Sequence, residues 1–313
     1  MSFQNSLLSN SAILMEGALG ERLKREYGIK IDETVAMANL VYNEKGRGAL
    51  KELWGEYASI SRKYQLPFIA TTPTRRANQE RVKLAGYDEA IILQNVEFLR
   101  KIKETSNTEM YLGGLLGCKG DAYTGEGALT SEQAKIFHSW QVNLFKEAEV
   151  DFLYAGIMPT LPEAIGMAIA IAETNIPYII SFTIQKDGKL IDGHTIDFAI
   201  RSIDSSVPQK PVGYMTNCVH PSIVYEALAH SFNQTETVRN RFIGIQGNTS
   251  ALPFNELDGS CDLKESAPID FANDTIRLFT EYHLKIFGGC CGTDHRHMEE
   301  IAKRLYTIAL NRK

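Results

Sequence analysis

Two adjacent cysteines, Cys290 and Cys291, stand behind a pair of glycines in the segment IFGGCCGTDHRH. Neighbouring residues of an ordinary strand point to opposite faces of the sheet, so adjacent sulfurs do not normally converge. Gly288 and Gly289 can adopt dihedral angles that are closed to other residues. We therefore expect a bend at the two glycines that brings both of the following sulfurs to one side.

A third cysteine, Cys218, ends an earlier apolar segment of the strand type. Three thiolates at one point make a soft site that suits Zn²⁺ and leaves the fourth tetrahedral position open, as a catalytic zinc needs. A thiol substrate bound there would lose its proton and become the nucleophilic thiolate. This chemistry favours S-alkyl transfer to a thiol over metal-assisted hydrolysis. The alternative is that the cysteines are small apolar core residues, which is common for free cysteine.

These cysteines need a fold that brings the ends of separate strands together. The chain repeats a short apolar run followed by an amphipathic stretch, which predicts alternating strands and helices. The predicted strands cover residues 12–18, 67–73, 109–117, 151–157, 177–184, 211–218, 241–248 and 284–291. Eight such units favour an α/β protein of the (β/α)₈ TIM-barrel type. A doubly wound sheet is the weaker alternative, because EGALGERL after the first strand lacks the full dinucleotide-binding pattern.

The barrel predicts where the chemistry lies, because active sites of this fold form at the C-terminal ends of the strands. Cys218 ends strand six and the cysteine pair ends strand eight, and inward residues of alternate strands meet in one layer. Cys218 can therefore face the pair across the end of the barrel. The long connections 118–130 and 249–267 are expected on the same face, and Thr130 or Ser131 should cap the helix that follows the first of them.

Composition limits the classes of protein that the chain could be. Of its 313 residues, 44% are hydrophobic and 23% are charged, as in globular proteins, and its net charge is −5 with both signs mixed along the chain. No basic stripe indicates nucleic acid, and no apolar run approaches the roughly 18 residues that span a bilayer. The N-terminus has no signal-peptide pattern, so we expect a cytoplasmic protein with reduced thiols. No linker or repeat divides the chain, which predicts one domain over 1–313, with a homo-oligomer as an assembly open to it.

The sequence GGCCGT at 288–293, with Asn217 and Cys218 on an earlier strand, resembles the zinc signature of the homocysteine S-methyltransferases. That family includes betaine–homocysteine methyltransferase and the homocysteine domain of cobalamin-dependent methionine synthase. MEGALGERL, GLLGCKGDAYTGEGALTSEQAKIFH and SFTIQKDGKLIDG extend the resemblance over most of the chain. The resemblance implies a zinc TIM barrel that methylates homocysteine to methionine, with the three cysteines as metal ligands.

The same resemblance implies four substrate-binding residues: Glu16, Gly17, Thr72 and Asn217. Glu16 and Gly17 stand where the family usually has Asp-Gly, so the carboxylate is one methylene longer. After strand four the family usually presents a Glu that helps to hold the ammonium group of the amino acid, and here Gly156 stands in its place. The loss of such a charge-assisted hydrogen bond typically costs about 1.5–3 kcal/mol.

Several other residues have simpler interpretations. Cys118 and Cys261 have no assigned role, and His220 is expected to begin the helix PSIVYEAL rather than to bind a metal. His295 and His297 are expected at the polar start of the last helix.

Two further groups follow strand ends. Arg75 and Arg76, after strand two, could bind a substrate carboxylate or remain solvated. Asn217 and Asn248 could hydrogen-bond a cysteine sulfur, as groups around metal ligands commonly do.

Together these features predict a zinc-dependent S-methyltransferase that acts on small molecules, with no catalytic residue beyond the zinc site. The expected mechanism is in-line attack of a zinc-bound thiolate on an activated methyl group. Homocysteine is the leading acceptor. The donor is expected to be a small sulfonium or ammonium compound, with S-methylmethionine ahead of S-adenosylmethionine and betaine. The alternatives are a family member retuned to another thiol and a homologue that binds zinc and a thiol without turnover.

Overall fold

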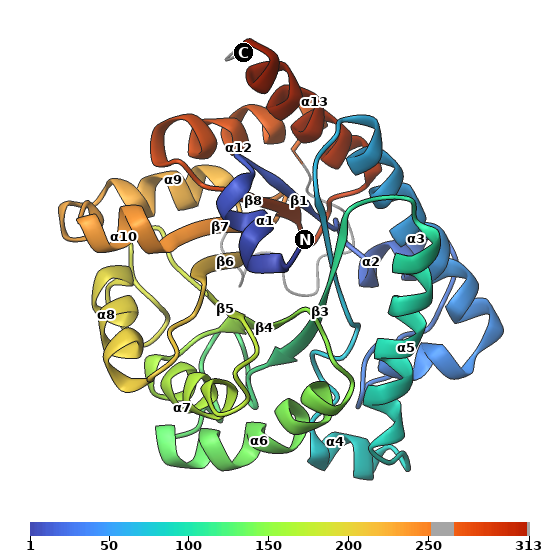
Figure 1. Cartoon of the computed structure of the whole chain (residues 1–313). Helices are drawn as coiled ribbons and strands as arrows, with labels where there is room; N and C mark the ends of the chain where they lie inside the picture. Colours follow the sequence, from blue (N-terminus) through green and yellow to red (C-terminus); the bar gives the residue numbers. More distant parts are fainter. Residues whose placement is uncertain (252–265, 312–313) are drawn as a thin grey trace.

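Eight parallel strands close into one barrel in chain order, and helices surround it (Figure 1). The computed structural model describes residues 1–251 and 266–311. The strands are β1 (Ile13–Met15), β2 (Phe68–Thr71), β3 (Met110–Gly117), β4 (Phe152–Met158), β5 (Tyr178–Phe182), β6 (Gly213–Val219), β7 (Phe242–Gly247) and β8 (Ile286–Gly289). Each lies within or overlaps one of the predicted strands, and the (β/α)₈ TIM barrel expected from the sequence is confirmed.

The helices fill the connections between the strands and cover the outside of the barrel (Figure 1). They are α1 (Phe3–Ser9), α2 (Gly20–Arg25), η1 (Ala38–Tyr42), α3 (Glu44–Lys63), α4 (Gln79–Leu84), α5 (Ala90–Thr105), α6 (Ser131–Glu147), α7 (Leu161–Ala172), α8 (Ile196–Ser206), α9 (Pro221–Ala229), η2 (Ser231–Asn233), α10 (Glu236–Arg241), α12 (Pro268–Tyr282) and α13 (His295–Asn311). Thr130 caps α6 as expected, in a reciprocal capping box with Gln133.

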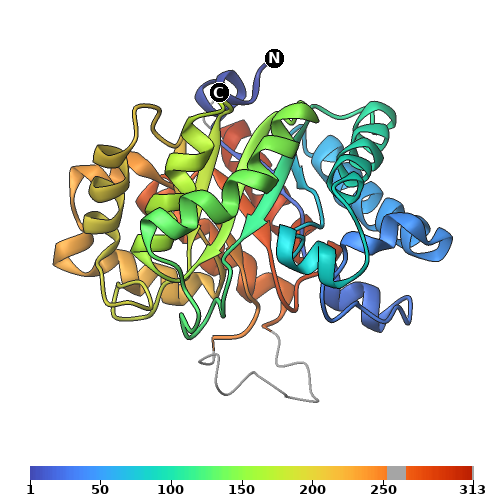
Figure 2. The same ribbon diagram turned by 90° about the horizontal axis from the view of Figure 1, so that it is seen from below.

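The first helix closes the N-terminal end of the barrel (Figure 2). Phe3 on α1 is buried and stacks on Phe152 with ring centroids 4.3 Å apart, near Tyr111. Both partners lie near the N-terminal ends of their strands, β4 and β3. The barrel interior is thus an apolar core, which leaves the opposite end for polar groups and chemistry.

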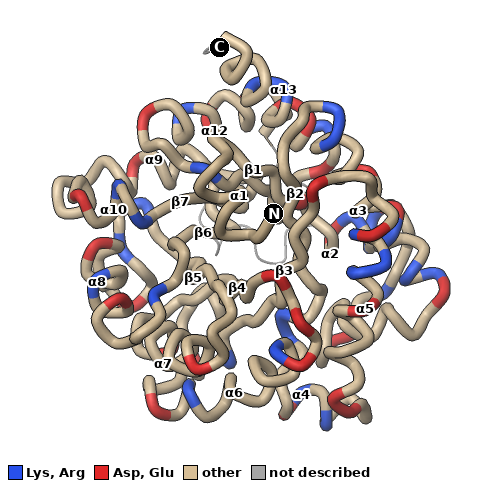
Figure 3. Tube along the Cα trace, in the orientation of Figure 1, with Lys and Arg blue, Asp and Glu red and all other residues tan. Residues whose placement is uncertain are grey.

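Charged residues of both signs are interspersed over the surrounding helices (Figure 3). The chain therefore shows no single-sign stripe in this view, in agreement with the mixed charge of the sequence. Among the described helices, none has both the length and the apolar character needed to cross a membrane.

Two strands become irregular at their C-terminal ends. The pairing of β4 with β5 shifts between Ala155 and Met158, and the pairing of β6 with β7 shifts between Asn217 and Val219. Within these shifts Ile157 and Cys218 adopt left-handed backbone conformations, with φ of 57° and 62°. Such conformations are costly for non-glycine residues and concentrate at functional sites.

Candidate metal centre and active site

The three predicted cysteine ligands meet at the C-terminal end of the barrel. The Sγ atom of Cys218 lies 3.5 Å from that of Cys291, and the Sγ atoms of Cys290 and Cys291 are 3.9 Å apart. All three sulfurs lie within 4.8 Å of one another, and all three thiols are free. We call Cys218, Cys290 and Cys291 the cysteine cluster. Its geometry could hold a metal ion.

The bend that we expected at Gly288 and Gly289 is absent, and that prediction is wrong. Both glycines belong to β8, and neither has a left-handed φ. Their role is to leave space: a Cβ at Gly289 would lie 2.2 Å from Thr293 Oγ1, and a Cβ at Gly288 would lie 2.8 Å from Met15 Cβ. The cysteine pair follows the end of the strand, so the alternation of side chains between faces no longer applies to it.

A tight turn after β8 holds the cysteine pair. The backbone N–H of Thr293 donates to the carbonyl of Cys290 at 3.1 Å, and its hydroxyl donates to the same carbonyl at 2.7 Å. The N–H of Thr249, after β7, donates to the carbonyl of Cys291 at 3.1 Å. Gly292 completes the turn with φ of 81°, a conformation open to glycine. Three backbone-directed hydrogen bonds therefore fix the two neighbouring sulfurs.

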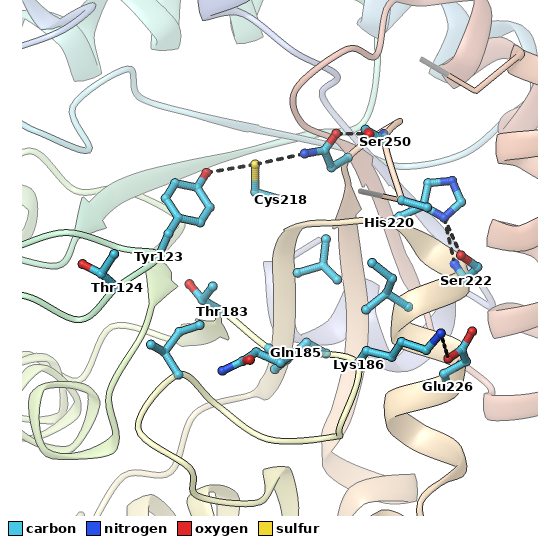
Figure 4. A pocket seen from close by; sticks show the side chains of 16 residues that line it. Tyr123, Thr124, Thr183, Gln185, Lys186, Cys218, His220, Ser222, Glu226 and Ser250 are labelled. Carbon is cyan, nitrogen blue, oxygen red and sulfur yellow. Dashed lines mark hydrogen bonds and ion pairs between the residues drawn. The ribbon is translucent and has the colours of Figure 1, made fainter. Parts of the chain in front are cut away.

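Cys218 reaches the pair because its own backbone is bent. Its left-handed φ falls inside the irregular pairing of β6 with β7, and such a bulge re-aims a side chain. Two side chains then contact its sulfur: the Tyr123 hydroxyl donates to it at 3.1 Å, and the Asn248 amide lies 3.8 Å away (Figure 4). The expectation that Asn248 bonds a cysteine sulfur is confirmed. Tyr123 was not predicted, although the placement of loop 118–130 on this face was, and is confirmed.

The three sulfurs of the cluster differ in how readily they ionise. Hydrogen bonds from Cys290 and then Cys291 lower the pKa of Cys218 well below its usual value. The contact with Cys218 in turn raises the pKa of Cys290 and of Cys291 well above the usual value. Three thiolates at this distance repel one another, so a cation is required for all three to be ionised together. Burial raises the pKa of Tyr123, which keeps its phenol a donor.

All four predicted substrate-binding residues line one cavity of about 370 Å³ beside the cluster. Its walls include Glu16, Gly17, Thr72 and Asn217, together with Cys290 and Cys291. We call this space the inner cavity. The structure therefore brings the predicted substrate residues and two of the predicted metal ligands to one place.

Glu16 is the buried carboxylate of the inner cavity. Its oxygens accept hydrogen bonds from the Thr71 N–H and hydroxyl and from the Trp54 indole N–H at 2.6–3.0 Å. Burial raises its pKa to about 7, against the lowering effect of these hydrogen bonds. Two carboxylate oxygens offer about four acceptor sites, so Glu16 can accept a further hydrogen bond from a ligand.

Thr72 and Asn217 line the cavity while their polar atoms bind the protein itself. The Thr72 hydroxyl accepts from the Leu115 N–H at 3.0 Å and contacts the Thr74 hydroxyl. The side-chain oxygen of Asn217 accepts from the Ile157 N–H at 2.8 Å and from the Ser181 hydroxyl at 2.7 Å. Asn217 thus supports the left-handed backbone of β4, a role that sequence reasoning did not assign.

The position of the missing family carboxylate is apolar. Gly156 lies in β4 and is not among the described residues that line the inner cavity, whereas its neighbour Ile157 is. A Cβ at Gly156 would lie 2.9 Å from Leu115 Cδ1. The cavity wall at this point is therefore contributed by Ile157 rather than by Gly156.

The remaining candidates have structural roles. His220 begins α9, and its ring accepts from the Ser222 N–H, which confirms the expected helix-entry role. His297 bonds to Asp294 at 2.9 Å and to the Ser266 carbonyl, away from the cluster.

His295 begins α13, and its ring lies 3.8 Å from a carboxylate oxygen of Glu56. Cys118 lies outside the cluster with its Sγ 3.5 Å from the Gly120 carbonyl, and burial raises its pKa to about 12. Cys261 falls outside the described residues.

Of the two arginines after β2, Arg75 lines the inner cavity and Arg76 does not. A guanidinium at the cavity wall can bind a carboxylate. The structure thus favours Arg75 over Arg76 as a substrate contact.

The fold and site together define a class: a TIM barrel with three cysteine thiols, able to hold a metal, beside a cavity for a small substrate. A model of the homocysteine S-methyltransferase family matches residues 13–305, and the chain belongs to this family. The protein is therefore a thiol S-methyltransferase, and the resemblance stated from GGCCGT is confirmed.

Solved structures agree with the fold. The metallated form of the homocysteine methyltransferase MmuM from Escherichia coli is 20% identical, with a TM-score of 0.73 over 95% of this chain and 98% of that one. The oxidized form of the same protein gives a TM-score of 0.75 over 95% of this chain and 97% of that one, again at 20% identity. No curated protein sequence matches the chain.

Proposed function

We propose that the protein is a zinc-dependent S-methyltransferase that transfers a methyl group from a small sulfonium or ammonium donor to homocysteine, giving methionine. The observation that carries the proposal is the cysteine cluster at the wall of the inner cavity, where Glu16 offers a buried carboxylate. A thiol that enters this cavity can reach the cluster while its charged end meets Glu16.

The cluster fits zinc by its donor set and by its spacing. Tetrahedral zinc with bonds of about 2.3 Å to sulfur places its sulfur ligands about 3.8 Å apart. The separations of 3.5 and 3.9 Å in the cluster bracket that value. Zinc bound by Cys218, Cys290 and Cys291 would supply positive charge that lowers the pKa of a substrate thiol and keeps it ionised.

The chain's own residues would position the reactants. Glu16 would accept a hydrogen bond from the ammonium group of homocysteine, and Arg75 would bind its carboxylate. Gly17, Thr72 and Asn217 would shape the wall around the carbon chain. The thiolate sulfur then forms a bond to the methyl carbon as the bond from that carbon to the donor sulfur or nitrogen breaks. The donor leaves as a neutral thioether or amine, and the proton of the thiol passes to solvent.

The donor and the setting of the enzyme are part of the same proposal. An S-methylmethionine-type sulfonium is our first choice of donor. The free cysteines of the cluster must stay reduced to bind metal, which suits the cytoplasm. We take residues 1–313 as a single domain, with a homo-oligomer as a possible assembly.

One observation favours a second candidate acceptor. Ile157 lines the inner cavity beside the strand position where the family usually presents a carboxylate. An apolar wall there would suit a thiol that lacks an ammonium group, so a retuned thiol acceptor is the alternative.

Methyl-transfer assays with zinc-loaded protein test both candidates. S-Methylmethionine, S-adenosylmethionine and betaine would each be offered to homocysteine and to thiols that lack the ammonium group. We expect methionine from homocysteine, with loss of activity after chelation and recovery after zinc is restored. Preference for a thiol without the ammonium group would establish the alternative. Undiminished activity of fully zinc-free protein would contradict the proposed role of the cluster, and thiol binding without product from any donor would indicate a non-catalytic homologue.

A further inference from the structure

A second and larger cavity reaches the cysteine cluster from the other side. It has a volume of about 530 Å³ and is lined by Cys218, whereas the inner cavity is lined by Cys290 and Cys291. We call it the outer cavity. Among the described residues, Tyr123 is the one that lines both cavities. The cluster thus borders both cavities, and Tyr123 stands where the two linings meet.

Tyr123 is held in place by its own hydroxyl. The phenol donates to the Cys218 sulfur at 3.1 Å, and the ring extends along the outer cavity (Figure 4). Because its hydroxyl and its backbone are both held, the Tyr123 side chain forms a fixed wall between the cavities.

The backbone of its loop is fixed at both ends by one buried carboxylate. Glu163, on α7, accepts from the Lys119 N–H at 2.7 Å and from the Leu129 N–H at 3.3 Å. Its third partner is the buried ring of His138, at 3.0 Å. Lys119 and Leu129 lie near the two ends of the 118–130 connection, so Glu163 holds the two ends of the loop together. We call Glu163 with its partners Lys119, Leu129 and His138 the clasp.

The turn that carries Tyr123 is also ordered locally. The Asp121 side chain accepts from the N–H groups of Tyr123 and Thr124 at 2.8 and 2.7 Å. Gly120 passes so close to the Glu126 carbonyl that a Cβ would lie 2.0 Å from that oxygen. Together these contacts hold the Tyr123 phenol against the Cys218 sulfur.

The outer cavity has groups that suit the charged end of a small zwitterion. Lys186 and Glu226 form an ion pair of 2.9 Å on its wall, with side chains 72% and 47% exposed (Figure 4). An exposed pair contributes little free energy, so a ligand can exchange into it at low cost. The buried Thr183 hydroxyl also lies on the wall and has no hydrogen-bond partner within the described part of the chain. A cavity of this volume accommodates an amino-acid-sized molecule.

We propose that Tyr123 separates two substrate compartments, with the acceptor thiol in the inner cavity and the methyl donor in the outer cavity. The donor's carboxylate pairs with Lys186 and its ammonium group with Glu226. The two compartments join at the cysteine sulfurs, where the methyl carbon leaves the donor sulfur and bonds to the acceptor sulfur. The assignment rests on the proposed function for the identity of the two substrates.

Removal of the wall tests the separation. In the native enzyme we expect homocysteine not to compete with S-methylmethionine. In Tyr123→Ala, homocysteine should enter the outer cavity and become a competitive inhibitor against S-methylmethionine. Tyr123→Phe keeps the ring but loses the hydrogen bond to Cys218, so competition by homocysteine should be weaker in it than in Tyr123→Ala, a graded effect that a merely structural role would not produce. Absence of competition in a folded Tyr123→Ala variant, checked by circular dichroism, would overturn the role of Tyr123.

The donor contacts are tested by direct binding. S-Methylmethionine is titrated calorimetrically into zinc-loaded protein without thiol, and Glu226→Gln should raise its Kd about five- to tenfold. Glu173→Gln is the matched control, because Glu173 forms a comparably exposed ion pair with Lys135 that lines neither cavity, and it should leave the Kd unchanged.

The two proposals fail in different ways. Binding of S-methylmethionine that depends on Glu226, without methyl transfer to any thiol, would support the outer cavity as its site and contradict the proposed function. Normal turnover with an unchanged Kd in Glu226→Gln would overturn the donor site and leave the proposed function standing.

Discussion

At the scale of single residues, the site depends on backbone conformations that composition does not reveal. Cys218 has no small or amide side chain to favour a left-handed φ, yet its φ is 62° and its sulfur meets Cys291 only because of that conformation. Asn217, its neighbour in the chain, supports a second left-handed residue, Ile157, through a hydrogen bond of 2.8 Å. The backbone at Cys218 and the wall of the inner cavity are therefore shaped by adjacent residues.

Loss of one cluster sulfur should abolish metal binding and activity. Cys290→Ala leaves two thiolates, which hold zinc far more weakly than three, so we expect less than one-tenth of the native zinc content and no measurable methyl transfer. Zinc would be measured by elemental analysis of the purified protein. Cys118→Ala, which removes a thiol outside the cluster, should retain native zinc content, and equal loss in both variants would speak against the cluster.

Glu16 should make stability depend on pH. Its pKa is about 7 in the folded protein and near 4.5 in an exposed carboxyl, so between these values the unfolded chain loses its proton first. Its contribution to stability is therefore fully present below pH 4.5 and falls as the pH rises through 7, by about 3 kcal/mol. Glu16→Gln should lack this component, which urea unfolding of both proteins across the range would measure. Parallel stability profiles for the two proteins would contradict the raised pKa.

The sequence predicted the cysteines of the cluster but not the residues that orient them. The three cysteines follow from residue type and from their position at strand ends, whereas Glu16 was implied by the resemblance to the family. Tyr123 lies in a loop rich in glycine and polar residues, where no periodicity indicates which side chain turns inward. The bend was assigned to Gly288 and Gly289 because glycine allows left-handed dihedrals, but these glycines serve close packing. Local propensity does not separate the two uses of glycine.

At the scale of elements, the connection after β3 behaves as part of the site rather than as a surface loop. Glu163 on α7 ties its two ends, and His138 on α6 completes the hydrogen bonding of that carboxylate. The strands themselves were predictable, since each is a short apolar run that ends in small or polar residues. The clasp was not predictable, because it joins residues that are far apart in the chain through a single buried side chain.

Glu163→Gln should destabilise the protein and loosen the loop. A neutral amide keeps the shape but offers one oxygen where two backbone N–H groups and a histidine need acceptors, so we expect a loss of about 1–3 kcal/mol in urea unfolding. Glu173→Gln, at the C-terminal end of the same helix, removes only an exposed ion pair, which should cost less than about 1 kcal/mol. Similar losses of unfolding free energy in the two variants would show that the hydrogen bonds of Glu163 contribute no more to stability than an exposed ion pair.

At the scale of the whole molecule, the two ends of the barrel have separate tasks. Helix α1 fills the N-terminal end with Phe3 and Leu7, which pack against the apolar residues of the barrel interior. The C-terminal end carries the cluster and both cavities. The short N-terminal helix gave no sign of this role in the sequence, because a single turn or two of mixed residues has no clear periodicity.

Removal of the Phe3 ring should therefore affect stability without affecting chemistry. Phe3→Ala empties a site 2% exposed and stacked on Phe152, so we expect a loss of about 3–5 kcal/mol in the free energy of unfolding. Leu8→Ala on the same helix, where Leu8 is 77% exposed, should change it by less than about 0.5 kcal/mol. The kcat of both variants should stay native below the unfolding transition, and a selective fall in kcat for Phe3→Ala would contradict the separation of the two ends.

The hydrogen bond from Ile157 to Asn217 has a consequence for how this enzyme can diversify. It links the wall of the inner cavity on β4 to the residue next to Cys218 on β6. A substitution of Asn217 would release the backbone at Ile157 and disturb Cys218 in the same step. Under the proposed function, a new acceptor specificity would come from exchange of the Ile157 side chain, with its backbone held, and not from remodelling of the strand. The chemistry and the choice of thiol can change independently only as long as this amide stays in place.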